Sequence, residues 1–202
     1  MQRTRIIVMA KAPVAGYAKT RLIPALGAVG AARLAQCLLD RAMTQARAAG
    51  FGAVELCCAP DAMHSAFSAQ ALQGGVVLTQ QGEGDLGARM QRAFERGLTS
   101  AAQVILIGTD APALDAAGLR AAAAALEVSD AVLAPAADGG YALIGLRRAA
   151  PRLFEHMPWS TDRVLALTRE RLAECGLRHA ELPAVHDIDE PADLRHLPPG
   201  WL

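Results

Sequence analysis

The chain has 202 residues, of which 52% are hydrophobic and 20% charged, and its formal net charge is zero. This apolar content is enough for a buried core, and the balanced charge argues against a nucleic-acid partner or a basic membrane surface. No apolar run reaches the roughly 18 residues of a membrane span, and no signal-peptide cleavage pattern follows the N-terminus. We therefore expect a cytoplasmic protein without a membrane partner.

The cysteines also indicate a reducing compartment. They form no C-x-x-C pair, and two of them are adjacent, which is poor geometry for an ordinary disulfide. We expect reduced thiols at Cys37, Cys57, Cys58 and Cys175.

Strand-length apolar runs alternate with segments of helical period along the first part of the chain. Strands are predicted at 6–9, 54–58, 76–78 and 104–107, and the last is wholly apolar, as expected of a central parallel strand. Helices are predicted at 34–46 with Gly50 as the stop, from Pro60 to about 72, at 86–98 and at 114–126.

The last part of the chain continues the alternation after one break. A strand at 131–134, a turn at 138–140 and a strand at 141–146 precede a helix at about 162–175, a strand near Glu181 and a short helix from Pro191. This order predicts an α/β fold with a mostly parallel sheet, helices on both faces and one antiparallel strand after the Gly-Gly turn. Because no linker or repeat interrupts the pattern, we expect one domain over 1–202.

The unusual polar residues follow the predicted strands. In sheets of this kind, ligands bind beyond the carboxyl ends of the strands. The residues expected there are Lys19, Thr20, Arg21, the 82–87 segment, Asp110, Asp138, Asp187 and Asp189.

The loop after the first strand has features of a phosphate-binding loop. Gly16 allows close backbone approach, and Lys19 and Arg21 supply fixed positive charge. It is not a Walker A loop, because Ala18 stands where that motif requires glycine. Of the 20 Lys and Arg residues only two are lysines, Lys11 and Lys19, and both lie in this loop, which favours a compact ammonium there. The alternative is a solvated surface loop.

The 82–87 segment matches G-x-G-x-x-G between a strand and a helix, so a Rossmann oxidoreductase is an alternative. Glu83 and Asp85 argue against it, because two carboxylates would crowd the pyrophosphate that this turn binds. Asp85 is better interpreted as the N-cap of the helix that begins at Leu86.

Three aspartates are candidate magnesium ligands. Asp110 lies at the tip of the central strand, and magnesium is typically held by one or two carboxylates together with substrate phosphates. Asp187 and Asp189, at i and i+2 of an extended segment, point to one face and could share the ion. Helix capping is the alternative for Asp110 before Pro112, and for Asp189 or Glu190 before the helix at Pro191.

The segments after the fifth strand also leave two interpretations open. Asp138 starts a turn that a simple hairpin would explain equally well. Trp159 is suited either to stacking on a sugar or to packing, while Ser160 or Thr161 is predicted to cap the next helix.

Taken in order, these segments resemble a bacterial family of small nucleotide-diphospho-sugar-transferase-like proteins, which includes the radical-SAM/selenodomain-associated transferases. The resemblance covers Met9 to Leu194 and rests on the ordered set rather than on any one motif. The motifs are Lys11-Ala12-Pro13, Gly16 to Leu22, Gly84-Asp85-Leu86-Gly87, Gly108 to Pro112, Asp138 to Tyr141 with Leu143 to Gly145, Trp159-Ser160-Thr161, and Asp187 to Asp189 with Pro191.

The resemblance implies a GT-A-type three-layer α/β/α sandwich and a metal-dependent transferase. The chain is also similar to phospholactate guanylyltransferases, which use aspartates like Asp110, Asp187 and Asp189 for Mg²⁺ (or Mn²⁺). It departs from the family pattern at Ala111, where a serine or cysteine is expected. The nucleotide-binding residues so implied are Lys11, Gly16, Lys19, Thr20, Arg21, Gly84, Leu86 and Gly87.

The leading functional hypothesis is glycosyl transfer from a nucleotide-diphosphate sugar to a small-molecule acceptor. Asp138 or His186 would act as the base toward that acceptor. The first alternative is nucleotidyl transfer from a nucleoside triphosphate with release of pyrophosphate, which the charged first loop favours. A nucleotide-binding protein without chemistry is a further alternative.

Overall fold

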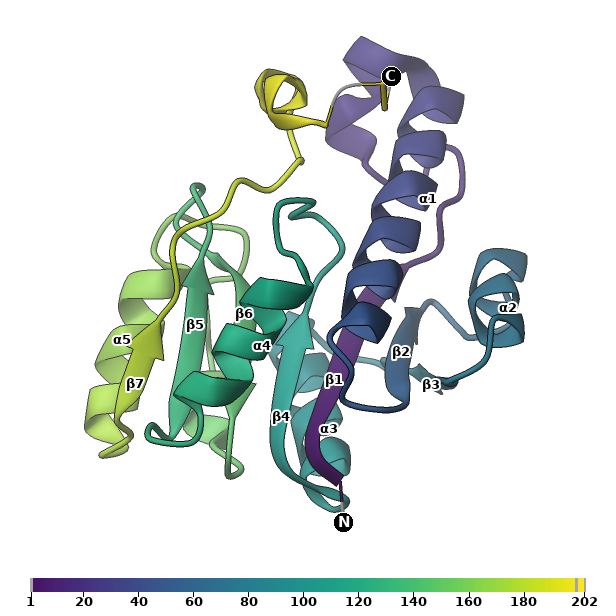
Figure 1. Cartoon of the computed structure of the whole chain (residues 1–202). Coiled ribbons are helices and arrows are strands. Elements are labelled where there is room, and N and C mark those ends of the chain that lie inside the picture. The colour runs from purple at the N-terminus through teal and green to yellow at the C-terminus, as the bar shows by residue number, and fades with distance from the viewer. Residues whose placement is uncertain (1, 199, 202) are drawn as a thin grey trace.

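The computed structural model describes residues 2–198 and 200–201 and has one seven-stranded sheet in the order β3-β2-β1-β4-β6-β5-β7 (Figure 1). β6 pairs antiparallel with β4 and β5, and the other pairs are parallel, as the sequence predicted. The strands are β1 (Gln2–Lys11), β2 (Val54–Ala59), β3 (Val76–Gln80), β4 (Ala101–Ile107), β5 (Ala131–Pro135), β6 (Tyr141–Leu146) and β7 (His179–Glu181).

Helices cover both faces of the sheet, which confirms the predicted three-layer α/β/α architecture. Along β1, Ile6 and Val8 face one helix layer and Ile7 and Met9 face the other, because successive side chains of a strand alternate. The first layer contains α1 (Ile23–Ala48), α2 (Ser65–Leu72) and α4 (Ala116–Ala125), and the second contains α3 (Leu86–Leu98) and α5 (Val164–Glu174). Short 3₁₀ helices form at η1 (Thr20–Leu22), η2 (Pro151–Leu153) and η3 (Pro191–His196).

Two helices differ from the predicted bounds for local reasons. α1 begins at Ile23, well before the predicted start, because Pro24 is accepted in its first turn and a kink at Gly27 (φ 70°) joins two helical pieces. α2 begins at Ser65 rather than at Pro60, because the ring of His64 caps it by accepting from the amide of Ala66.

The stretch Thr20–Ala48 is long and apolar enough, by length and composition alone, to cross a membrane. The expectation that the chain has no such run was therefore wrong. In the structure Leu34, Leu38 and Met43 are buried on one face of this helix, as in an amphipathic helix that packs on a sheet.

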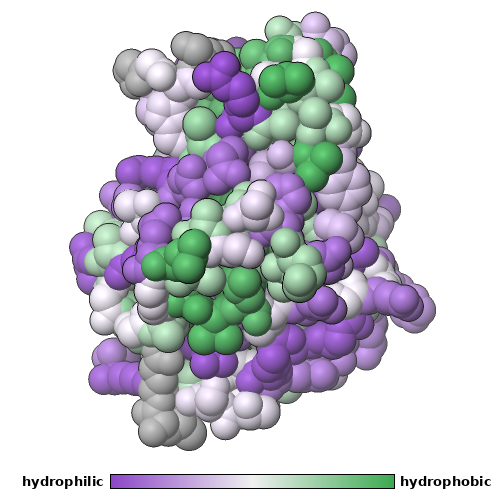
Figure 2. Space-filling model, turned by 90° about the vertical axis from the view of Figure 1, so that its right-hand side faces the viewer, coloured by the Kyte–Doolittle hydropathy of each residue, from purple (hydrophilic) through white to green (hydrophobic). Residues whose placement is uncertain are grey.

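Three exposed apolar side chains lie on β3 and on the α2 segment beside it. In Figure 2, which faces the side of β3 and α2, green hydrophobic side chains gather among hydrophilic ones. Met63, Leu72 and Val77 are 84%, 88% and 46% exposed. This edge lies away from the carboxyl ends of the central strands, where the polar residues of interest gather.

Candidate active site

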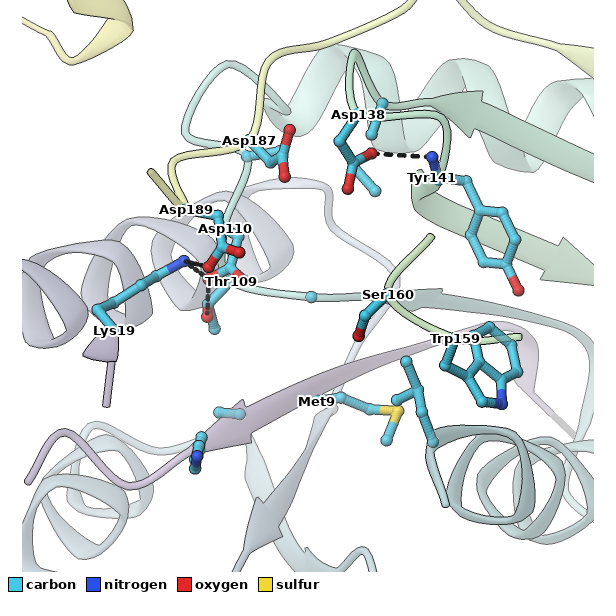
Figure 3. Close-up of a pocket in the computed structure, with 18 of the residues that line it drawn as sticks. Met9, Lys19, Thr109, Asp110, Asp138, Tyr141, Trp159, Ser160, Asp187 and Asp189 are labelled. Carbon is cyan, nitrogen blue, oxygen red and sulfur yellow. Dashed lines mark hydrogen bonds and ion pairs between the residues drawn. The ribbon is translucent and has the colours of Figure 1, made fainter. Parts of the chain in front are cut away.

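A cleft of about 500 Å³ opens at the carboxyl edge of the sheet. It is bounded by the segments that follow β1, β4, β5 and β7 and by the first turns of α3 and α5 (Figure 3). This is the edge at which parallel α/β sheets bind ligands. Its charged lining residues are Lys11, Lys19, Arg21, Asp110, Asp138, Asp187 and Asp189.

Lys19 joins the two acidic segments of the cleft. Its backbone is left-handed (φ 49°) and its side chain is 7% exposed. The ammonium donates to the carbonyl of Ile188 at 2.5 Å, and lies 2.7 Å from Oδ1 of Asp110 and 3.7 Å from Oδ1 of Asp189 (Figure 3). The sequence predicted a phosphate contact for Lys19. In the structure Lys19 neutralises the carboxylates.

The other two cations of the first loop are more accessible. Nη1 of Arg21 lies 2.7 Å from Oδ2 of Asp189, and the Arg21 side chain is 56% exposed. The ammonium of Lys11 lies 4.0 Å from the ring centroid of Tyr17, and it makes no ion pair with any residue that the structure describes. Lys11 is therefore the cation most available to a phosphate.

In the segment after β7, successive side chains point alternately into the cleft and into the core. Asp187 and Asp189 line the cleft, while Ile188 between them is fully buried against Leu22 and Leu34. The amide of Ile188 also donates to the carbonyl of Asp110 at 2.8 Å, which fixes the segment to the β4 tip. Glu190, not Asp189, occupies the N-cap of η3. Asp110 is not a helix cap either, since Asp115 caps α4.

The surroundings of Asp187 disfavour the charged form of its carboxyl group. Its pKa is raised above the ordinary value, first by burial and then by the nearby carboxylate of Asp138, with Asp193 and Asp110 adding to the effect. A bound cation would relieve this repulsion.

The donor chemistry fits a hard divalent cation. Among the described residues no three His, Cys, Asp or Glu side chains form a closed metal cage. Mg²⁺ does not need one, because it is usually bound by one or two carboxylates together with substrate phosphates. Asp110, Asp187 and Asp189 all line the cleft; Asp110 is paired with Lys19 and Asp189 with Arg21, whereas Asp187 has no ion pair with the described residues.

The Asp138 turn does more than connect two strands. Oδ1 of Asp138 accepts from the amide of Gly140 at 2.8 Å. A side chain at Gly139 would lie 2.3 Å from the carbonyl oxygen of Asp162, and the Gly139 carbonyl accepts from the amide of Leu165. The turn therefore fixes the start of α5 beside the cleft.

Four residues of the predicted site do not line the cleft. The three glycines Gly16, Gly84 and Gly87 are absent from its lining; the Asp85 side chain caps α3 through the amide of Ala88 at 2.8 Å, as predicted. His186 is exposed, and its ring stacks on His196 with centroids 3.9 Å apart. The predicted glycine contacts with a nucleotide and the predicted base role of His186 are thus not supported by this geometry, whereas Leu86 and Thr20 do line the cleft.

Several residues that line the cleft were not predicted from the sequence. Gln81 is 7% exposed, and its Nε2 donates to the carbonyls of Ala10 and Cys57 at 3.1 and 3.0 Å. Its Oε1 accepts no hydrogen bond from the described residues and remains available to a ligand. Met9 and Tyr17 also line the cleft. No local signal marks these side chains, because only the sheet brings them together.

Comparisons with known proteins identify a family and a solved structure of the same fold. Residues 42–161 match the family described as "Uncharacterized protein conserved in bacteria (DUF2064)". A "putative nucleotide-diphospho-sugar transferase" from Desulfovibrio desulfuricans G20 is 29% identical, with 96% of this chain and 85% of that chain covered and a TM-score of 0.87. Among curated proteins, none matches the chain.

Two more distant structures share the fold. CMP:2-keto-3-deoxy-manno-octonic acid synthetase complexed with CTP is 14% identical, with 96% of each chain covered and a TM-score of 0.58. Rv0371c from Mycobacterium tuberculosis complexed with manganese is 23% identical, with 98% of each chain covered and a TM-score of 0.55. The expected fold is confirmed, and the expected class of enzyme, a transferase, agrees with these structures.

Proposed function

This chain belongs to the DUF2064 family, and from that premise we propose that it transfers a group from a nucleotide-activated donor bound with Mg²⁺ or Mn²⁺ in the cleft. The observation that carries the proposal is that Asp110 at the β4 tip and Asp187 after β7 line one cleft, whose two acidic segments Lys19 joins. Such a carboxylate pair suits an ion that also binds the donor phosphates. When bound, the ion would supply charge stabilisation to the departing phosphate group.

The chain's own residues divide the remaining work. Lys11, Thr20 and the exposed end of Arg21 lie where they can contact phosphate oxygens. Oε1 of Gln81 is placed to accept a hydrogen bond from a nucleobase. Asp138 lines the cleft opposite Lys19, so its carboxylate is the candidate base for the acceptor hydroxyl (Figure 3).

Glycosyl transfer from a nucleotide-diphosphate sugar to a small-molecule acceptor is the leading reaction. Lys19 and one edge of Arg21 are engaged by carboxylates, so fewer free cations face a ligand than the sequence predicted. A diphosphate needs less fixed charge than a triphosphate. Nucleotidyl transfer is the second candidate, because a synthetase of the same fold is complexed with CTP. A cytoplasmic location and a single domain stay predictions.

A thermal-shift panel of nucleotide sugars and nucleoside triphosphates, each with and without Mg²⁺, tests the proposal. A true ligand at a hundred times its Kd stabilises the fold by about 2.7 kcal/mol. Asp110→Asn should remove the Mg²⁺-dependent part of this effect without unfolding the protein. Release of a nucleoside diphosphate or of pyrophosphate then separates the two reactions. If no nucleotide stabilises the protein with either metal, the proposal fails.

A further inference from the structure

The cleft has two chemically unlike halves. The charged side chains gather around Asp110 and Asp187, whereas the floor between the first turns of α3 and α5 is apolar (Figure 3). This apolar half consists of Met9, Met90, Leu106, Ile144, Trp159 and Val164. Met90 and Ile144 are 3% and 0% exposed, so they support the floor from beneath, and the half-buried Trp159 supplies its accessible apolar surface. A donor with several negative charges belongs to the first half, which leaves the second for another group.

The wall of the apolar half is built around Trp159. A side chain at Gly87 would lie 2.6 Å from the carbonyl oxygen of Phe154 and 3.0 Å from two atoms of the Trp159 ring. The indole therefore packs directly on the glycine backbone at the start of α3. Leu86, next to that glycine, is 45% exposed at the lip of the cleft.

Ser160 supplies an exposed hydroxyl to this half. Its backbone is left-handed (φ 63°), a conformation that is unfavourable for a residue with a side chain. The hydroxyl of Thr161 bonds to the carbonyl of Pro158 at 2.8 Å, which helps to hold the turn. The Ser160 hydroxyl makes no hydrogen bond to the part of the chain that the structure describes, and Ser160 lies between Trp159 and the carboxylates (Figure 3).

We infer that the apolar half is the acceptor subsite and that it takes an alcohol with a hydrocarbon body, whose hydroxyl bonds to Ser160. This inference rests on the proposed glycosyl transfer. A polyhydroxylated acceptor fits poorly, because hydroxyls placed against Leu86 and Trp159, the accessible apolar side chains of this half, would lose water without gaining partners. In the transfer, the acceptor oxygen bonds to the anomeric carbon while the bond from that carbon to the diphosphate oxygen breaks. The hydroxyl proton passes to Asp138.

Two probes with the same six-carbon ring test the inference: cyclohexanol, with one hydroxyl, and myo-inositol, with one on every carbon. Their affinities for the full chain are measured by saturation-transfer NMR. Cyclohexanol is expected to bind at least about fivefold more tightly than myo-inositol, because each unpartnered hydroxyl weakens binding. Ser160→Ala should weaken cyclohexanol binding by roughly twofold to tenfold.

A matched pair of variants ties the binding to this surface. Leu86→Ser changes an exposed apolar residue at the lip, and Val128→Ser changes one that is 69% exposed and outside the cleft. Only Leu86→Ser should weaken cyclohexanol binding. The inference is overturned if myo-inositol binds as well as cyclohexanol, if cyclohexanol does not bind at its solubility limit, or if the two variants behave alike.

The failure of this inference is distinguishable from the failure of the proposed function. Nucleotide binding with Mg²⁺ is measured on the same samples. If nucleotides bind but the alcohols do not follow the expected order, only the acceptor subsite is wrong. If no nucleotide binds, the transferase proposal is wrong and the acceptor role falls with it.

Discussion

At the residue scale, Lys19 is the side chain whose role the tertiary structure changed most. Its ammonium bonds to the Ile188 carbonyl and pairs with Asp110, so it connects β4 to the segment after β7. Lys19→Met keeps the aliphatic stem and removes the charge. We expect a loss of about 1.5–3 kcal/mol in the free energy of unfolding, the usual value for a hydrogen bond to a charged group. Urea unfolding measures it.

Added Mg²⁺ should restore part of that stability in Lys19→Met, since the ion can neutralise the carboxylates that the ammonium leaves unpaired. Lys11→Met is the control. Within the described part of the chain, the Lys11 ammonium interacts with the ring of Tyr17 alone, and an exposed cation–π contact contributes about 0.5–1 kcal/mol. Equal losses in the two variants would contradict the bridging role of Lys19.

Asp187 leads to a prediction with opposite effects on stability and binding. Because burial and Asp138 raise its pKa, the folded state favours the protonated carboxyl. The associated stability is present below the ordinary pKa of 3.8 and is lost as the pH rises through the folded pKa. At pH 7 without metal, Asp187→Asn should therefore keep or raise the Tm.

The same variant should weaken Mg²⁺-dependent nucleotide binding at least about tenfold, as the loss of metal-site groups usually does. In the wild type, this binding should fall as the pH drops through the raised pKa of Asp187. Calorimetry at several pH values with matched ionic strength measures the affinity. A lower Tm together with unchanged affinity would rule out Asp187 as a ligand.

At the element scale, the first turns of α3 and α4 each contain a glycine, but only the one in α3 has no room for a side chain. A side chain at Gly87 in α3 would lie 2.6 Å from the Phe154 carbonyl oxygen, whereas the nearest atom at Gly118 in α4 would be 3.4 Å away. Gly87→Ala should destabilise the protein by roughly 1–3 kcal/mol through overpacking. Gly118→Ala should stabilise it by up to about 1 kcal/mol, because alanine favours helix. Thermal unfolding that shows the same sign for both would refute the packing argument.

The edge strand β7 is tied to α5 by an ion pair. Nε of Arg169 donates to Oε1 of Glu181 at 2.7 Å, and Nη2 donates to Oε2 at 2.8 Å. The hydrogen bond from Arg169 lowers the pKa of Glu181 from its ordinary value of 4.5. The resulting stability is present above pH 4.5 and is lost as the pH falls through the lowered pKa.

Glu181→Gln should therefore destabilise the protein by about 0.2–1 kcal/mol at neutral pH, the range of exposed ion pairs. The difference from the wild type should vanish in acid and shrink in high salt. Glu170→Gln, on the same helix and without an ion pair among the described residues, is the control. A difference that persists below the lowered pKa would contradict this assignment.

At the scale of the whole molecule, the segment after β7 closes the cleft from the C-terminal side. It contacts the first loop through Lys19 and Arg21, and the β4 tip through the amide of Ile188. Donor binding with Mg²⁺ should slow hydrogen exchange at 186–194 and in η1. The β3 edge and α2 lie away from the cleft and should exchange as before, which provides an internal control. Uniform slowing over the chain would indicate global stabilisation instead of closure.

Much of the fold could be predicted because it depends on local chemistry and on simple periodicity. The apolar run Val104–Ile107 belongs to a central strand because both of its faces are covered. Asp85 caps α3 through an amide three residues away. The gathering of Asp110, Asp187 and Asp189 at one edge follows from the parallel order of the strands.

The tertiary structure alone decided what these side chains contact. Lys19 and Ile188 are 169 positions apart, so no spacing rule could show that the ammonium bonds to that carbonyl. Gly87 matches a dinucleotide motif in sequence, yet its missing side chain makes room for Trp159. Local sequence sets the elements through hydrogen bonding and apolar period, whereas the partners of a side chain depend on which segments pack together, and packing is non-local.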